Sequence, residues 1–350
     1  MAFKVVQVID KPGSYMPDYG EMIRQAGIEV EFLKVDCSTE DEIIDAAADA
    51  DVVVGVATFQ PLTRRVIDNL EKCRFIMSLG IGYDNLDVKA ATERGVFTAN
   101  VPDYCQEEMS DHAMALILVC TRKIVRLNDI VKAGQWKQEP DPDIQMGVWP
   151  SMARLSGQTL GLVGLGRIAR TLVPKAKAFG LRIIAYSPHV DRKIFDEFNV
   201  ERVELDQLLA QSDIISLHTA LTPQNKHLLG AEQFNKTKPG AYLINTARGG
   251  LVDQEALYQA LVSGKLAGAA LDVTDPEPIN ADDPLLNLEN VVITAHSAHA
   301  SIPSLMALLN RPAEEVIRVL RGEEPVGLIN PEAKGKYIQR WGPGNHSDNG

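Results

Sequence analysis

The segment from Leu160 to Ser187 places the tightest constraint on how this chain can fold. A short apolar run opens it, and Gly164, Gly166 and Ala169 follow in the spacing G-x-G-x-x-A. Residues 168–179 then keep a helical pattern, and a second apolar run covers residues 181–186. This order predicts a strand, a tight turn, a helix and a second strand, which together form a βαβ unit.

Each small residue of such a turn has a separate physical task. The first glycine allows the turn, the second lets the backbone approach a pyrophosphate, and the small third residue lets helix and strand pack closely. The helix N-terminus then offers unpaired N–H groups and the positive end of its dipole to the phosphates. We therefore predict a dinucleotide-binding domain, and the alternative is a packing turn that binds no ligand.

Ser187 occupies the strand end where an acidic residue usually binds the ribose hydroxyls of NAD. A serine does not repel a 2′-phosphate as a carboxylate would, and Arg192 and Lys193 follow closely. NAD and NADP therefore both stay open as the cofactor.

Composition limits the kinds of partner that the protein is expected to bind and the compartment in which it is expected. The chain has 350 residues and a formal net charge of −12, which argues against nucleic acid or an anionic membrane as a partner. Its longest apolar run, Ala113–Cys120, is too short to cross a bilayer, and the N-terminus has no signal-peptide pattern. The four cysteines lack disulfide-framework and metal-ligand spacings, so we expect free thiols, a cytoplasmic location and no metal site.

Residues 1–100 alternate strand and helix patterns but contain no phosphate-binding turn. Such alternation predicts a second parallel sheet that is covered on both faces. The predicted fold class is therefore α/β, with two Rossmann-like or flavodoxin-like domains separated by an active-site cleft. Residues 1–101 with 299–332 are expected to form the substrate domain, and residues 102–298 the dinucleotide-binding domain. Residues 333–350 are polar and glycine-rich, so we predict a mobile tail there.

Three predicted strands of the dinucleotide-binding domain end in polar side chains, which include Arg248, Glu277 and His296. The carboxyl ends of parallel strands meet at one edge of a sheet, so these side chains converge on one crevice. An arginine fork suits a carboxylate, and a histidine suits proton transfer near neutral pH. A carboxylate beside the histidine favours its charged form. In the first domain, the turn at Leu79–Ile81 could offer N–H groups to a carboxylate, or could be a plain strand-to-helix turn.

The segments NTARGGLVDQEAL, ALDVTDPEP and TAHSA resemble the D-isomer-specific 2-hydroxyacid dehydrogenases. VGLGRI, SLHTALTPQNKHLL and SLGIGYDNLDVKAATERGVFTANVPDY fit the same family, and the resemblance covers about Val52 to Gly322. Within the family the chain looks nearest to the branch of the C-terminal-binding-protein corepressors. The resemblance implies an NAD(P)-dependent oxidoreductase that transfers hydride between a D-2-hydroxy acid and a 2-keto acid, and that forms a homodimer through its nucleotide domain.

The same resemblance assigns roles to individual residues. Arg248, Glu277 and His296 would be catalytic, with His296 as general acid and base. Leu79, Gly80 and Ile81 would bind the substrate together with Arg248 and His296. The implied cofactor contacts are Gly164, Gly166, Arg167, Ile168, Ser187, Thr219, Thr222, Asn225, Thr246, Ala247, Arg248, Asp272, His296, Ala298 and His299.

Some positions depart from the family pattern. Ser187 stands where most members have Asp, and His299, where Gly or Trp is common, is either a second substrate contact or a rim residue. These changes leave the 2-keto acid, the cofactor preference and the physiological direction open. The alternative function is a regulatory protein that senses the nicotinamide pool by binding partners, as corepressors do. A formate-dehydrogenase-like reaction is disfavoured, because that family carries Gln where this chain has Glu277.

Overall fold

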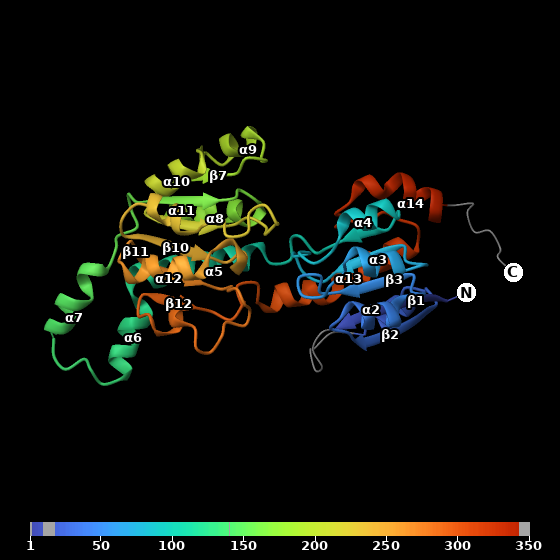
Figure 1. Cartoon of the computed structure of the whole chain (residues 1–350), viewed down its shortest axis with the longest axis horizontal. Coiled ribbons are helices and arrows are strands. Elements are labelled where there is room, and N and C mark those ends of the chain that lie inside the picture. Colours follow the sequence, from blue (N-terminus) through green and yellow to red (C-terminus); the bar gives the residue numbers. More distant parts are fainter. Residues whose placement is uncertain (1, 10–17, 140, 343–350) are drawn as a thin grey trace. The chain divides into compact units, whose positions relative to one another are not determined.

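The computed structural model describes residues 2–9, 18–139 and 141–342. Contacts within the chain divide it into two compact units, coloured along the sequence in Figure 1. Unit 1 comprises Met1–Tyr104 and Ser301–Gly350, and unit 2 comprises Cys105–Ala300. The boundaries expected from the sequence, after residues 101 and 298, fall within three residues of these divisions.

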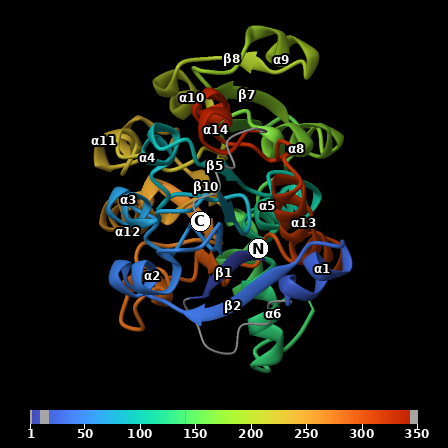
Figure 2. The ribbon, with the colours of Figure 1, turned by 90° about the vertical axis from the view of Figure 1, so that its right-hand side faces the viewer.

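Unit 1 is built on a five-stranded parallel sheet with the strand order β2-β1-β3-β4-β5. The strands are β1 (Phe3–Ile9), β2 (Val30–Asp36), β3 (Val52–Gly55), β4 (Phe75–Ser78) and β5 (Phe97–Ala99). The helices are α1 (Tyr19–Gln25), α2 (Glu40–Ala47), α3 (Arg64–Asn69), α4 (Val88–Glu93), α13 (Ile302–Leu320) and α14 (Lys334–Trp341). Figure 2 shows α2, α3 and α4 on one side of this sheet and α1 and α13 on the other.

The end of the described chain corrects the expected mobile tail. A 3₁₀ turn (Pro331–Ala333) leads directly into α14, and only residues 343–350 of the expected tail lie outside the described residues. The Tyr337 ring stacks on Phe97 with centroids 3.8 Å apart, and Ala333 is fully buried in the same core. Ala333, Tyr337 and Trp341 recur every four residues, so this helix has an apolar stripe that polar neighbours concealed in the sequence.

Unit 2 contains a seven-stranded parallel sheet with the order β12-β11-β10-β9-β6-β7-β8. The strands are β6 (Thr159–Val163), β7 (Arg182–Tyr186), β8 (Glu201–Arg202), β9 (Ile214–Leu217), β10 (Ala241–Asn245), β11 (Leu266–Leu271) and β12 (Val291–Ile293). The helices are α5 (Gln106–Arg122), α6 (Ile124–Lys132), α7 (Pro142–Gly147), α8 (Arg167–Ala178), α9 (Arg192–Glu197), α10 (Leu205–Gln211), α11 (Ala231–Lys236) and α12 (Gln254–Val262). Chain order reverses between β6 and β9, which makes the carboxyl end of this pair a topological switch point.

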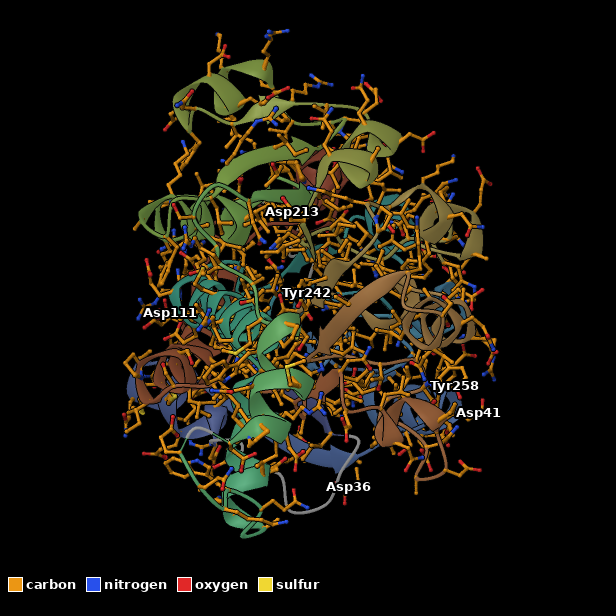
Figure 3. The ribbon with its side chains drawn as sticks, turned by 90° about the vertical axis from the view of Figure 1, so that its left-hand side faces the viewer. Asp36, Asp41, Asp111, Asp213, Tyr242 and Tyr258 are labelled. Atoms are coloured by element: carbon orange, nitrogen blue, oxygen red, sulfur yellow. The ribbon has the colours of Figure 1, made fainter. Side chains whose placement is uncertain are left out.

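An arm formed by α6 and α7 extends away from the sheet of unit 2 (Figure 1). The sequence pattern predicted one helix over residues 106–132, but Lys123 adopts a left-handed conformation with φ 55° and separates α5 from α6. Tyr242 on β10, labelled in Figure 3, anchors the base of the arm. Its hydroxyl donates to the Ser151 carbonyl at 3.1 Å, and the Lys123 ammonium lies 4.9 Å from its ring centre.

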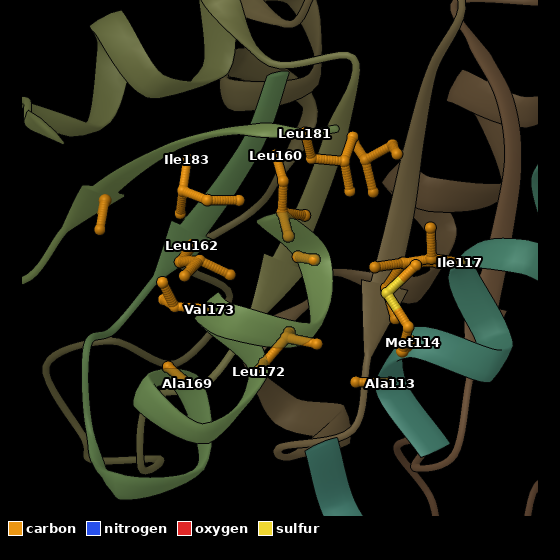
Figure 4. Packing of buried hydrophobic residues seen from close by; sticks show 14 of the residues in the cluster. Ala113, Met114, Ile117, Leu160, Leu162, Ala169, Leu172, Val173, Leu181 and Ile183 are labelled. Atoms are coloured by element: carbon orange, nitrogen blue, oxygen red, sulfur yellow. The ribbon is translucent and has the colours of Figure 1, made fainter. Parts of the chain in front are cut away.

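The predicted βαβ unit forms as expected and supplies the main core of unit 2. Figure 4 shows α8 and α5 packed over the sheet through a set of buried apolar side chains. The set includes Ala113, Met114, Ile117, Leu160, Leu162, Ala169, Leu172, Val173 and Ile183. The predicted α/β class with two parallel sheets is therefore confirmed. No helix within the described residues is long and apolar enough to span a membrane.

Candidate active site

The glycine turn after β6 lies at the switch point. Gly164 has φ 101°, and a Cβ there would lie 2.6 Å from the carbonyl oxygen of His218, which follows β9. Gly164 is therefore required by the protein's own packing. A Cβ on Gly166, at the start of α8, would meet nothing closer than 4.0 Å. Packing does not explain that second glycine, whereas a pyrophosphate bound against the backbone does.

A buried polar atom also favours a ligand at this edge. The Thr246 side chain is 2% exposed, and its hydroxyl oxygen has no hydrogen-bond partner among the described residues. Buried hydroxyls are normally paired, so an unpaired one at a predicted binding position indicates a missing partner. Gly166 and Thr246 together fit a dinucleotide.

Arg248 is held by its neighbour Asn245, the last residue of β10. The Asn245 amide oxygen accepts the Ala247 N–H at 3.0 Å, and its nitrogen donates to the Arg248 carbonyl at 2.8 Å. Asn245 is 1% exposed, and Arg248 remains partly exposed. Arg248 therefore lies on a loop whose backbone is fixed by hydrogen bonds to the Asn245 side chain.

Gly249 ties this loop to the next one. A Cβ at Gly249 would lie 2.0 Å from the carbonyl carbon and oxygen of Thr274, so no larger residue fits without moving backbone. Thr274 lies three residues before Glu277. The backbones that carry Arg248 and Glu277 are therefore in direct contact.

Glu277 and His296 form the predicted pair. The Glu277 carboxylate Oε1 is hydrogen-bonded to Nδ1 of His296, and the two side chains are 28% and 34% exposed. This bond leaves Nε2 as the ring nitrogen that faces away from the carboxylate. The arrangement is that of an imidazole oriented for proton transfer by a carboxylate.

Asp272, at the end of β11, organises the loop that carries His296. Its Oδ1 accepts the Thr294 hydroxyl at 2.6 Å and the Ser297 N–H at 2.9 Å, and its Oδ2 accepts the Ala298 N–H at 2.9 Å. Its backbone carbonyl accepts the His296 N–H at 2.9 Å. His296 itself has φ 49°, an unfavourable conformation that these bonds hold in place. The predicted cofactor contact of Asp272 stays a prediction.

His299 lies edge-on to His296, with ring centroids 6.0 Å apart. Burial, and then the neighbouring His296, lower the pKa of His299 from its ordinary value. Asp272 and a hydrogen bond to the His296 carbonyl act in the opposite direction. Because the net shift is downward, His299 is neutral at pH 7, which makes it a poor alternative proton donor.

The remaining predicted residues lie at two loops and one helix end. Arg167 and Ile168 open α8, and Ser187 directly follows β7. In the loop after β9, the Asn225 amide accepts the Thr222 N–H at 2.7 Å and donates to the Ala220 carbonyl at 2.8 Å. Asn225 thus closes its own loop, and its contact with a cofactor, like that of Thr219 and Thr222, stays a prediction.

In unit 1, the turn after β4 fits its predicted role only in part. The Leu79 N–H donates to the Gly55 carbonyl at 2.8 Å, so it is not available to a substrate carboxylate. Gly80 has φ 104°, and the carbonyls of Gly80 and Ile81 accept from Val101 and Asn100. A substrate contact stays a prediction at this turn, now only for the N–H groups of Gly80 and Ile81.

Comparison with known proteins identifies the family. The family model described as "D-isomer specific 2-hydroxyacid dehydrogenase, NAD binding domain" matches residues 114–298. A glyoxylate reductase of Korarchaeum cryptofilum is 42% identical over 291 residues, which cover 83% of this chain and 86% of the relative. The chain belongs to the D-isomer specific 2-hydroxyacid dehydrogenases.

Solved structures agree with this assignment. The D-lactate dehydrogenase of Aquifex aeolicus, in complex with NAD and lactic acid, matches with TM-score 0.76 and 27% identity over 91% of this chain and 96% of that one. An acyclic imino acid reductase in complex with NADPH and D-Arg matches with TM-score 0.78 and 26% identity over 93% and 99%. This dehydrogenase is thus an oxidoreductase that transfers hydride between a nicotinamide cofactor and a 2-hydroxy or 2-keto acid. The regulatory alternative gains no support from these relatives.

The sequence did not point to several residues that hold this site. Asn245 and Thr294 lay inside quoted motifs without a role of their own. Arg202 is a further candidate, because it donates to the Pro188 carbonyl at 3.3 Å beside the loop after β7. It follows Ser187 by fifteen residues, and only the pairing of β7 with β8 brings it near. Among the described residues, no group of three or more His, Cys, Asp and Glu side chains is arranged to hold a metal ion.

Proposed function

We propose that this dehydrogenase reduces a small 2-keto acid with His296 as the proton donor, and that glyoxylate is the first candidate substrate. The observation that carries the proposal is the hydrogen bond between Glu277 and His296 at the carboxyl edge of the unit 2 sheet. A reduced nicotinamide cofactor, when bound, supplies the hydride. Supporting the choice of glyoxylate, the Korarchaeum cryptofilum relative is named a glyoxylate reductase.

Each residue then has one task in the reaction. As hydride reaches C2 of the keto acid, negative charge grows on the carbonyl oxygen, and His296 donates a proton to that oxygen from Nε2. Glu277 holds the ring through its hydrogen bond to Nδ1, which leaves Nε2 to carry the transferred proton. Arg248 keeps its proton, so it binds the substrate carboxylate and polarises the carbonyl. In the direction of oxidation, His296 accepts the proton from the hydroxyl.

The assay that tests this proposal offers glyoxylate, pyruvate, hydroxypyruvate and phenylpyruvate to the purified protein with NADH or NADPH. His296→Ala is expected to lower turnover by ~10²–10⁴, the usual effect of losing a general acid. The variant should still bind the reduced cofactor, as followed by its fluorescence, which separates lost chemistry from lost folding. A loss of less than tenfold would remove His296 from the role of proton donor. Failure of the wild type with every keto acid and both cofactors would refute the proposal as a whole.

We further propose that the cofactor site accepts NADPH as well as NADH. Ser187 is uncharged, and the Arg202 guanidinium donates to the carbonyl of Pro188, the residue after Ser187. Arg192 and Lys193 are exposed at the start of α9 nearby. A guanidinium beside this loop suits a 2′-phosphate, and no carboxylate at position 187 repels one.

We also propose that the protein is a homodimer and that the arm contributes to its interface. No residue of α6 or α7 is buried. Large apolar side chains of the arm are exposed, among them Trp136 at 53%, Met146 at 80% and Trp149 at 49%. A concentration of exposed apolar side chains on one extension indicates a protein–protein interface. A cytoplasmic location stays a prediction.

A further inference from the structure

His112 is a polar residue of α5 to which the roles above give no task. Its Nε2 lies 3.1 Å from the Thr294 hydroxyl oxygen and 3.6 Å from Oδ1 of Asp272. Its side chain is 24% exposed, and α5 packs against β10, β11 and β12. The imidazole is therefore held against Asp272, which follows β11, and Thr294, which follows β12 and opens the loop that carries His296.

The directions of these hydrogen bonds follow from a count of protons. Thr294 has one hydroxyl proton and donates it to Asp272 Oδ1 at 2.6 Å. The Thr294 oxygen can then only accept from His112, so Nε2 must be the protonated nitrogen of that ring. His112 therefore donates a hydrogen bond to Thr294, and Thr294 donates one to Asp272.

Asp272 connects these hydrogen bonds to the loop that carries His296. Its two carboxylate oxygens accept the N–H groups of Ser297 and Ala298, and its carbonyl accepts the N–H of His296. These bonds surround the left-handed conformation of His296, which is not favourable by itself. A shift of the Asp272 carboxylate would therefore move the imidazole that donates the proton.

We propose that His112 is a positioning residue for His296, acting through Thr294 and Asp272. This inference rests on the proposed role of His296 as proton donor. Without the N–H of His112, the Thr294 hydroxyl loses the donor that fixes its rotamer, and the Asp272 carboxylate loses the alignment that this hydroxyl imposes. Small displacements of a catalytic group reduce the rate strongly, while substrate binding by Arg248 is left intact.

The test compares two replacements of His112. His112→Leu removes the donor and is expected to lower the kcat of keto-acid reduction about tenfold, the scale of one lost hydrogen bond, with the KM for the keto acid changed less than about threefold. His112→Gln keeps an N–H donor at similar reach and should recover most of the kcat. Thr294→Val should lower kcat by a similar factor, and the double variant His112→Leu with Thr294→Val should be no slower than the slower single variant.

Two controls keep a structural effect apart from a positioning effect. Thr121→Val removes a hydroxyl bond to the Ile117 carbonyl on the same helix, nine residues from His112 and thus ~13 Å along its axis. It should lower the thermal midpoint without changing kcat. Equal kcat values for His112→Leu and wild type, or a failure of Gln to recover more than Leu, would overturn the inference. His296→Ala is assayed in parallel. If it is inactive while His112→Leu is fully active, only the role of His112 is wrong; if it is also active, the proposed function itself fails.

Discussion

At the scale of single residues, the candidate site depends as much on groups that do not react as on those that do. Arg248, Glu277 and His296 were predictable, because each follows an apolar strand and belongs to a motif of specific residue types. Asn245 and Asp272 hold the loops that carry them, and both are almost fully buried. The partners of Asp272 lie up to 26 residues away, as for Ala298, so no local pattern reveals its bonds. Asn245 bonds to the nearby Ala247 and Arg248, but only the folded loop shows that it does so.

The proposed tolerance for NADPH can be tested at two residues. Ser187→Asp places a carboxylate where a 2′-phosphate would lie, so the ratio of kcat/KM values should shift toward NADH by ~1–2 kcal/mol, or about 5- to 30-fold. Arg202→Gln should lower kcat/KM with NADPH and leave NADH unaffected. Steady-state kinetics with both cofactors measures these ratios.

Arg126→Gln is the matched control for Arg202→Gln. It also removes one partly exposed positive charge from unit 2, but Arg126 pairs with Glu289 instead of contacting the loop after β7. It should leave the cofactor ratio unchanged. A wild type that shows no activity with NADPH would contradict the proposed tolerance for this cofactor.

At the scale of elements, predictions were correct where a local signal sets a boundary. Thr39 and Glu42 have the spacing of a capping box and form one before α2, and Asp253 caps α12 through the Ala256 N–H. The break at Lys123 was missed, since lysine is not a residue that typically adopts a left-handed conformation. Helix α14 was missed because its polar composition concealed its few apolar positions, of which Tyr337 stacks on Phe97, a residue far away in the sequence.

The arm yields a prediction about oligomeric state. The protein should sediment as a species of ~77 kDa, twice its mass of 38.3 kDa, because an exposed apolar arm is stabilised by burial against a second copy. Replacing both Met146 and Trp149 by Asp should place charges in this interface and shift the protein toward the monomer at micromolar concentration. Val262→Asp, on α12 and 57% exposed, is the control and should leave the mass unchanged. A monomeric wild type would exclude the proposed dimer.

At the scale of the whole molecule, each unit has its own sheet with a hydrophobic core on either face. The sequence predicted both sheets, since alternating strands and helices leave few other solutions. It did not predict α14, whose Tyr337 stacks on Phe97 of this unit. Residues 299–332, which precede this helix, were expected in the unit. The Asn330 side chain accepts the Thr98 N–H at 2.9 Å and donates to the Val96 carbonyl at 2.9 Å, across more than 230 residues.

The stability of unit 2 should depend on pH through His218. Burial lowers the pKa of His218 from its ordinary 6.5 to about 4. Below pH 6.5 the unfolded chain binds a proton at His218, whereas the folded chain binds it only near pH 4. The free energy of unfolding therefore falls as pH drops from 6.5 toward 4. Because the side chain keeps some contact with solvent, we expect a loss of ~1–2 kcal/mol between pH 6.5 and 4.5 beyond that of His218→Asn.

Urea denaturation at each pH measures this difference. Trp341→Phe as the common background leaves only Trp136 and Trp149, both in unit 2, so that fluorescence follows the unfolding of that unit. Parallel pH dependences for the two proteins would show that His218 is not the group responsible.

Asp272 holds the backbone of the His296 loop, so these bonds do not depend on which side chains the loop carries. Its carboxylate binds the backbone N–H groups of Ser297 and Ala298, which every amino acid except proline possesses. The side chains of Ala295 and Ser297 are exposed and contribute nothing to these two bonds. Natural variation or a directed library can therefore change the exposed side chains beside His296 while the position of His296 stays the same.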